Sequence, residues 1–159
     1  MYLDLDRTPV GRSTLPLAGT VALGMGEACA PETTLSGELT LQNLEGRVLA
    51  SGTLQASGTA ECGRCLAEFR LDWEVPVDLM VLRDVHTDET EGDTLLILQR
   101  DGEVDLSEAL RECAALSFPQ APVCREDCRG LCASCGADLN TAPCDCAAGD
   151  SDPRWEGLP

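Results

Sequence analysis

Apolar and polar residues alternate along the middle of the chain, which is the period of strands with one buried face. The first such run places Leu35, Gly37, Leu39 and Leu41 on one side. Turn residues at Asn43–Gly46 and a second run at Val48–Ala56 follow. Together they predict a hairpin over Leu35–Ala56, which the short stretch Gly58–Cys62 could extend.

A longer alternating run, Leu66–Arg83, predicts a further strand. Pro76 lies within it and lacks a backbone N–H, so the strand must bend there or run along a sheet edge. Trp73 is expected in the core and not as a ligand platform. The acidic stretch Asp84–Asp93 predicts a loop, after which Thr94–Gln99 is apolar again.

One helix is predicted after the Asp101-Gly102 turn. Asp105 and Glu108 stand three residues apart, as in a capping box, and the apolar face that follows is formed by Leu106, Ala109, Leu110 and Cys113. Phe118-Pro119 ends it. Beyond residue 120 no apolar period continues. The pattern therefore predicts an α+β fold: a β-rich, antiparallel core domain with one main helix over residues 1–120, and an irregular C-terminal segment, residues 121–159, packed on that core.

Composition limits the size of the core. Aromatic residues make up 3% of the chain, so the core is aliphatic and modest, a setting in which a structural metal adds stability. The start, MYLDLDRTPV, is neither basic nor apolar, and no run of 18 apolar residues occurs, so we expect a cytoplasmic protein with no membrane partner. In that reducing compartment ten cysteines favour metal or redox chemistry over disulfides.

The formal net charge is −17. Basic residues do not cluster, which disfavours unaided nucleic-acid binding through phosphate contacts. An acidic surface suits a basic partner, although the same charge also serves solubility alone.

The spacing of the C-terminal cysteines is the strongest chemical signal. Six of them form the pattern C-x3-C-x3-C-x2-C-x8-C-x-C, namely Cys124, Cys128, Cys132, Cys135, Cys144 and Cys146. The segment Cys132–Leu139 has the form of a zinc knuckle, in which Gly136 permits the tight turn that follows the second cysteine. We expect structural zinc here. An iron–sulfur cluster, a redox dithiol and disulfides are the alternatives.

A second C-x2-C motif, Cys62 and Cys65, lies between two predicted strands. Added to the six tail cysteines it makes eight, the number that two four-cysteine zinc sites require. The alternative is a reduced turn that binds no metal. Cys29 and Cys113 would stay free, with Cys113 in the helix core.

No catalytic constellation is visible, so we expect no enzyme. His86 is the sole histidine and lies in the predicted acidic loop. Phosphate-binding and dinucleotide-binding glycine motifs are absent from the sequence. A zinc held by four thiolates keeps no open position for water, unlike a catalytic zinc.

Several segments of the chain resemble the YceD family of bacterial and plastid proteins, both in their sequence and in their order and spacing. They are CGRCL (62–66), GEVDLSEALRE (102–112), PQAPVC (119–124), CRGLCASCGADLN (128–140), CDC (144–146) and DPRWEGL (152–158). The resemblance marks Cys62 and Cys65 as the family's central C-x2-C, and Cys124–Cys146 as a tail that some members carry. It implies a role in processing or accumulation of large-subunit ribosomal RNA.

We therefore expect a non-enzymatic factor in large-subunit ribosomal RNA accumulation and ribosome assembly, holding one or two structural zinc ions. Its acidic surface would bind a basic ribosomal protein or an assembly intermediate. One alternative is a zinc module that binds RNA directly through Arg125, Arg129 and Arg154. Another is a redox or metal-responsive switch that uses Cys62 and Cys65.

Overall fold

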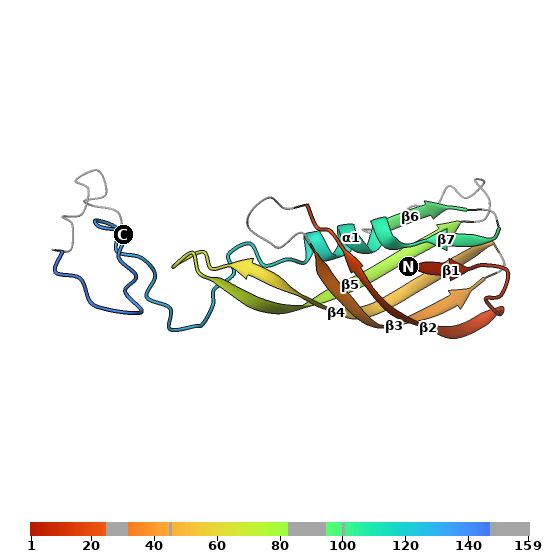
Figure 1. Ribbon diagram of the computed structural model, residues 1–159. Coiled ribbons are helices and arrows are strands. Elements are labelled where there is room, and N and C mark those ends of the chain that lie inside the picture. The colour runs from red at the N-terminus through yellow and green to blue at the C-terminus, as the bar shows by residue number, and fades with distance from the viewer. Residues whose placement is uncertain (25–31, 45, 83–94, 100, 147–159) are drawn as a thin grey trace, which may run out of the picture.

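The computed structural model describes residues 1–24, 32–44, 46–82, 95–99 and 101–146. A five-stranded sheet has the order β2-β3-β4-β5-β6. Its strands are β2 (Gly11–Val21), β3 (Thr33–Asn43), β4 (Arg47–Glu61), β5 (Glu68–Leu82) and β6 (Leu95–Leu98). A second sheet pairs β1 (Tyr2–Asp4) with β7 (Glu103–Asp105), and helix α1 spans Ser107–Leu116. The described part is thus strand-rich with one helix, as the sequence predicted (Figure 1).

The predicted hairpin is confirmed as β3 and β4, closed by the Leu44 N–H donating to the carbonyl of Arg47 at 2.8 Å. β4 and β5 then pair along their whole length, from Arg47 opposite Leu82 to Glu61 opposite Glu68. This long hairpin extends beyond the rest of the sheet, and the described part of the C-terminal segment, residues 121–146, lies at its far end (Figure 1).

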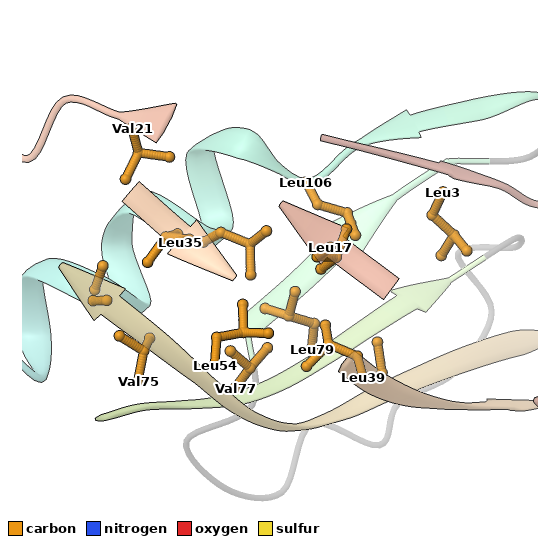
Figure 2. Close-up of a cluster of buried hydrophobic side chains, with 14 of the residues drawn as sticks. Leu3, Leu17, Val21, Leu35, Leu39, Leu54, Val75, Val77, Leu79 and Leu106 are labelled. Atoms are coloured by element: carbon orange, nitrogen blue, oxygen red, sulfur yellow. The ribbon is translucent and has the colours of Figure 1, made fainter. Parts of the chain in front are cut away.

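One face of the large sheet is apolar and covered. Leu35, Leu54 and Leu79 are completely buried there, among the side chains that Figure 2 shows from strands far apart in the sequence. Helix α1 packs against β5 and β2, burying Leu110 and Ala114. Buried and exposed positions alternate along β5, as the period-two sequence pattern predicted.

Trp73 lies in the core, as predicted, with 7% of its surface exposed. Its ring meets that of Phe118 edge to face, with centroids 5.3 Å apart. Pro76 stands opposite Thr53 on β4, at a point where β6 has not yet begun to pair with β5. Of the two placements predicted for this proline, a bend or a sheet edge, the described strands show the second: β5 forms a local edge at Pro76.

The predicted capping box is wrong. Asp105 belongs to β7, and the N-cap residue of α1 is Leu106, which makes no side-chain capping bond. The Asp105 carboxylate accepts a hydrogen bond from the Ser107 N–H at 2.9 Å. Glu108 binds Arg111 and does not reach back to Asp105, as a capping box would require. Pairing of β7 with β1 holds Asp105 in an extended conformation one residue before the N-cap position, which the local sequence signal could not reveal.

The antiparallel prediction holds for four of the five strands of the large sheet, but β6 runs parallel to β5. The sequence patterns also missed β1, β2 and β7.

The predicted loop at Asp84–Asp93, with His86, lies outside the described residues, as does Cys29. No described helix has the length and apolarity needed to cross a membrane.

We expect Leu54→Ala to destabilise the fold by about 2–5 kcal/mol, because it removes buried methyl groups and leaves a cavity. Leu116→Ala is the matched control, since Leu116 is 84% exposed at the end of α1 and should change stability by less than about 0.5 kcal/mol. Urea unfolding followed by circular dichroism measures both. Equal losses for the two variants would contradict this assignment of the core.

Candidate metal centres

The turn between β4 and β5 presents Cys62 and Cys65 at the end of the long hairpin. The Cys62 N–H donates to the carbonyl of Ala67, and the Leu66 N–H donates to the carbonyl of Cys62, each at 2.9 Å. Leu66 has a positive φ of 60°, alone among the non-glycine residues described. A left-handed leucine is strained by roughly 1–2 kcal/mol, so the surrounding contacts must hold this turn in place.

A second turn with the same backbone bonds occurs at the zinc-knuckle motif. The Cys132 N–H donates to the carbonyl of Ala137 at 2.8 Å, and the Gly136 N–H donates to the carbonyl of Cys132 at 2.9 Å. Gly136 has a φ of 74°, as the sequence predicted from its position after the second cysteine. The two C-x2-C motifs therefore adopt one conformation, although only the second has glycine at the left-handed position.

The first cysteine cluster joins the hairpin turn to the C-terminal segment. Its members are Cys62, Cys65, Cys124 and Cys128. The Sγ atoms of Cys62 and Cys128 are 3.9 Å apart, and those of Cys65 and Cys124 are 3.7 Å apart. All four Sγ atoms lie within 4.8 Å of one another. Two cysteines that belong to the tail pattern are thus combined with two that lie about sixty residues earlier.

Backbone hydrogen bonds fix the C-terminal segment against this turn. The Gly63 N–H donates to the carbonyl of Pro122 at 2.8 Å, and the Leu131 N–H donates to the carbonyl of Arg64 at 3.0 Å. The Arg64 guanidinium also donates to the carbonyl of Cys128 at 3.0 Å. Arg64 therefore holds the segment with both its backbone and its side chain, a role that sequence reasoning missed because nothing distinguishes this arginine locally.

The second cluster lies wholly within the C-terminal segment. Its members are Cys132, Cys135, Cys144 and Cys146, whose Sγ atoms again lie within 4.8 Å of one another. Cys135 and Cys146 are exposed, whereas Cys62 and Cys128 of the first cluster are buried. The first cluster is thus the better protected from water.

The backbone favours a thiolate at the first position of each turn. The Cys124 N–H, 3.4 Å from the Cys62 sulfur, is the main cause that lowers the pKa of Cys62 to about 6. Backbone N–H groups of Cys135 and Ser134 lower the pKa of Cys132 to about 6.

Other members of the clusters are held protonated. Burial and the neighbouring thiols raise the pKa of Cys124 to about 12, and hydrogen bonding with Cys135 is the main cause that raises the pKa of Cys146 to about 11. Without a cation each cluster therefore accommodates one thiolate readily but further negative charge poorly. A divalent ion would stabilise the fully deprotonated set.

The donor set and spacing fit zinc. Four thiolates around a tetrahedral zinc, with Zn–S distances of about 2.3 Å, have sulfurs about 3.8 Å apart. Two sulfur pairs of the first cluster, at 3.7 and 3.9 Å, lie at that separation, and the others lie within 4.8 Å. A disulfide would require about 2.05 Å, and the described cysteines are free.

All eight candidate ligand residues from the sequence fall in the two clusters. Cys113 lies in α1, half-buried against the core and outside both clusters. Arg125 and Arg129 lie beside the first cluster, whereas Arg154 and the segment 152–158 lie outside the described residues. Sequence reasoning missed Asn140, whose side chain contacts Cys128.

Comparisons with known proteins identify relatives. The family described as Large ribosomal RNA subunit accumulation protein YceD matches residues 50–159. An uncharacterized protein of Mycobacterium tuberculosis is 34% identical over 122 residues, covering 76% of this chain and 58% of that protein. A Mycobacterium leprae protein is 30% identical over 151 residues, covering 87% of this chain and 68% of its own length.

A plant protein also matches over a shorter region. The Arabidopsis thaliana protein named Large ribosomal RNA subunit accumulation protein YCED homolog 1, chloroplastic, is 36% identical over 56 residues, covering 35% of this chain and 17% of that protein. The chain spans less than two thirds of the length of the first mycobacterial relatives. No solved structure matches it.

Two glycines of the C-terminal segment allow a matched test of the docked arrangement. Gly130 and Gly136 both have a φ of 74°, so alanine carries the same conformational penalty of roughly 1–2 kcal/mol at each. A Cβ on Gly130 would also lie 2.9 Å from the carbonyl oxygen of Arg64, whereas one on Gly136 would meet nothing within 4 Å.

We expect Gly130→Ala to detach the segment from the hairpin turn, because backbone atoms cannot yield as a flexible side chain can. The measurement is hydrogen exchange of the Leu131 amide, which donates to Arg64. Exchange should accelerate in Gly130→Ala and stay near the wild-type rate in Gly136→Ala. Similar acceleration in both variants would show that the penalty is conformational only, and would contradict the docking.

Proposed function

This chain belongs to the YceD family, and on that premise we propose that it is a non-enzymatic factor that supports the accumulation of large-subunit ribosomal RNA. The observation that carries the proposal is the family match over residues 50–159, a range that contains all eight clustered cysteines. The plant relatives from Arabidopsis thaliana and Zea mays bear names that refer to large ribosomal RNA subunit accumulation.

The proposal includes one zinc ion in each cysteine cluster. Two sulfur pairs of the first cluster are 3.7 and 3.9 Å apart, and all sulfurs within each cluster lie within 4.8 Å of one another. These separations support a single ion in each cluster, because an iron–sulfur cluster would place several metal atoms between the thiolates and spread them further apart. Zinc would supply the folding free energy that the C-terminal segment lacks, on the order of 10 kcal/mol per structural site. Four thiolates complete its coordination, so the role is structural and not catalytic.

The proposed partner is a basic ribosomal protein or an assembly intermediate that contains one. The uncovered face of β5 supports this, because it exposes Glu68, Asp72, Glu74 and Asp78 at alternate positions. Arg70 on the same face is paired with Asp72, at 3.5 Å. The chain carries a formal charge of −17. Electrostatic complementarity would therefore favour binding of a basic protein and raise the rate at which the two proteins associate.

One observation favours the rival function of direct RNA binding. Arg125 and Arg129 are both exposed beside the first cluster, and both donate to the side chain of Asn140. They are two basic residues at one place on an acidic chain, although Arg129 makes its bond through its backbone N–H. Arg125 is also engaged by Asp127 at 3.3 Å, which reduces the positive charge available to phosphate.

We expect two zinc ions per chain after purification under reducing conditions, measured by elemental analysis. Cys62→Ser with Cys65→Ser should lower the content to one, and so should Cys132→Ser with Cys135→Ser, because each pair belongs to a different cluster. Cys113→Ser, outside both clusters, is the control and should retain two. Stoichiometric iron with visible absorption, or unchanged zinc in both double variants, would count against the zinc centres.

Depleting the protein from its cells should lower large-subunit ribosomal RNA relative to small-subunit RNA, because the proposed role is in accumulation of the large-subunit RNA. Quantitative RNA analysis and subunit profiles measure this, with re-expression of the wild-type chain as the control. Unchanged RNA ratios and profiles on depletion would sink the proposal.

Affinity purification in the same cells separates the two modes of action. A basic protein partner should be recovered at low salt and released by high salt. Glu68→Gln, Glu74→Gln and Asp78→Asn together should abolish recovery, while Asp101→Asn, Glu103→Gln and Glu126→Gln, which change the charge equally elsewhere, should not. Binding to naked RNA that is lost on Arg125→Ala with Arg129→Ala would instead establish the rival function.

A further inference from the structure

Asn140 lies between Cys135 and Cys144 of the second cluster, yet its side chain contacts the first cluster. Its Nδ2 donates to the Cys128 sulfur at 3.5 Å. Its Oδ1 accepts from the Arg129 N–H at 2.8 Å and from the Arg125 guanidinium at 2.9 Å. Asn140 therefore supports a sulfur of one centre from the loop of the other, without being a ligand of either.

Asp138 fixes the orientation of this amide. One carboxylate oxygen of Asp138 accepts from the Asn140 backbone N–H at 2.9 Å and from its Nδ2 at 2.7 Å. The reverse orientation would turn Oδ1 toward the carboxylate and the sulfur, and Nδ2 toward two donors. Every polar atom of the side chain thus has a partner that requires the observed orientation.

The loop that carries Asn140 depends on the second cluster. The turn at Cys132–Ala137 opens it, and Cys144 and Cys146 close it. The Leu139 N–H also donates to the carbonyl of Gly130 at 2.9 Å, and Leu131 bridges to Asp138. No described residue of this loop belongs to the apolar core, so its order rests on these hydrogen bonds and on the gathering of the four thiolates at its two ends.

We propose that Asn140 couples the two metal centres, so that zinc in the second cluster raises the zinc affinity of the first. The inference rests on the zinc part of the proposed function. Donors to a ligand atom orient it and stabilise its negative charge, and removing such a group weakens metal binding by about 10–100-fold. By linkage, zinc in the first cluster raises the affinity of the second by the same factor.

The test is a double-mutant cycle on the affinity of the first cluster for zinc. Asn140→Asp keeps the shape of the side chain and its acceptor for Arg129, but turns an oxygen toward the Cys128 sulfur. The second cluster is either intact or removed by Cys144→Ser with Cys146→Ser. Affinity is measured by competition with a chelator, and protection of Cys62, Cys65, Cys124 and Cys128 from alkylation identifies zinc at the first cluster.

Thr141→Ala is the matched control. Thr141 lies in the same loop and its hydroxyl donates to the carbonyl of Asp138 at 2.8 Å, but it contacts no sulfur. It should leave the affinity of the first cluster within about twofold of wild type. Circular dichroism of each variant checks that the sheet is folded. We expect unchanged spectra, because Asn140 lies outside the core.

With the second cluster intact, Asn140→Asp should weaken zinc binding at the first by about 10–100-fold. Removing the second cluster should weaken it by a similar factor, and Asn140→Asp should then add about twofold or less. Equal weakening in both backgrounds would show that Asn140 acts within the first centre alone, and no weakening would show that it does not act at all. Either overturns the coupling while leaving two zinc centres; a wild-type chain that binds no zinc overturns both proposals.

Discussion

The pairing of β4 with β5 along their full length is the constraint on which the rest of the structure depends. One face of this hairpin supplies core residues such as Leu54 and Val75, both completely buried. The turn between β4 and β5, which contains Cys62 and Cys65, follows Glu61, and this end of the hairpin extends away from the rest of the sheet (Figure 1). A register shift of one residue would exchange the two faces, exposing the core and turning the acidic face inward. The same pairing therefore positions core, surface and cysteine turn together.

The C-terminal segment, at the far end of the β4–β5 hairpin, has little apolar burial to order it. Phe118 is the last buried member of the apolar core, and no residue after it joins the core among those described. Ordering a backbone residue costs roughly 1–2 kcal/mol, and isolated hydrogen bonds contribute about 1 kcal/mol each. The bonds to Gly63 and Arg64 are too few to order the segment alone. The metal binding that we propose for the cysteine clusters would supply an interaction of sufficient size.

Periodicity predicted the elements that are long and half-buried: β3, β4, β5 and α1. It missed β1 and β7, which are three residues long and owe their pairing to a partner about a hundred positions away. β2 carries the apolar alternation Leu15, Leu17 and Val21, but Gly19 interrupts the series and Pro16 lies within it, so the strand signal was weak. The parallel β6 could not be foreseen, because period alone does not fix strand direction.

For the candidate site, the spacing of cysteines indicated which residues carry the chemistry, but not how they divide. Six tail cysteines read in order would place a first set of four at Cys124–Cys135. The structure instead assigns Cys124 and Cys128 to the hairpin turn. The reason is steric as well as chemical: the close approach of Gly130 to Arg64 brings only the first part of the segment against β4 and β5. Spacing along a chain does not encode that approach.

The two C-x2-C turns share one backbone but differ in what surrounds them. At the first, Leu66 occupies a left-handed position that glycine holds at the second, and Cys62 is completely buried. Such strain persists only where neighbouring contacts determine the conformation, and here the docked segment supplies them. The second turn has no comparable enclosure, since Cys135 is exposed. Its glycine adopts the left-handed conformation without strain, so this turn needs no such support.

The first turn thus requires the segment to be docked, whereas the second can form before docking. The Asn140 side chain, which donates to the Cys128 sulfur, links the loop of the second turn to the cluster that the first turn completes.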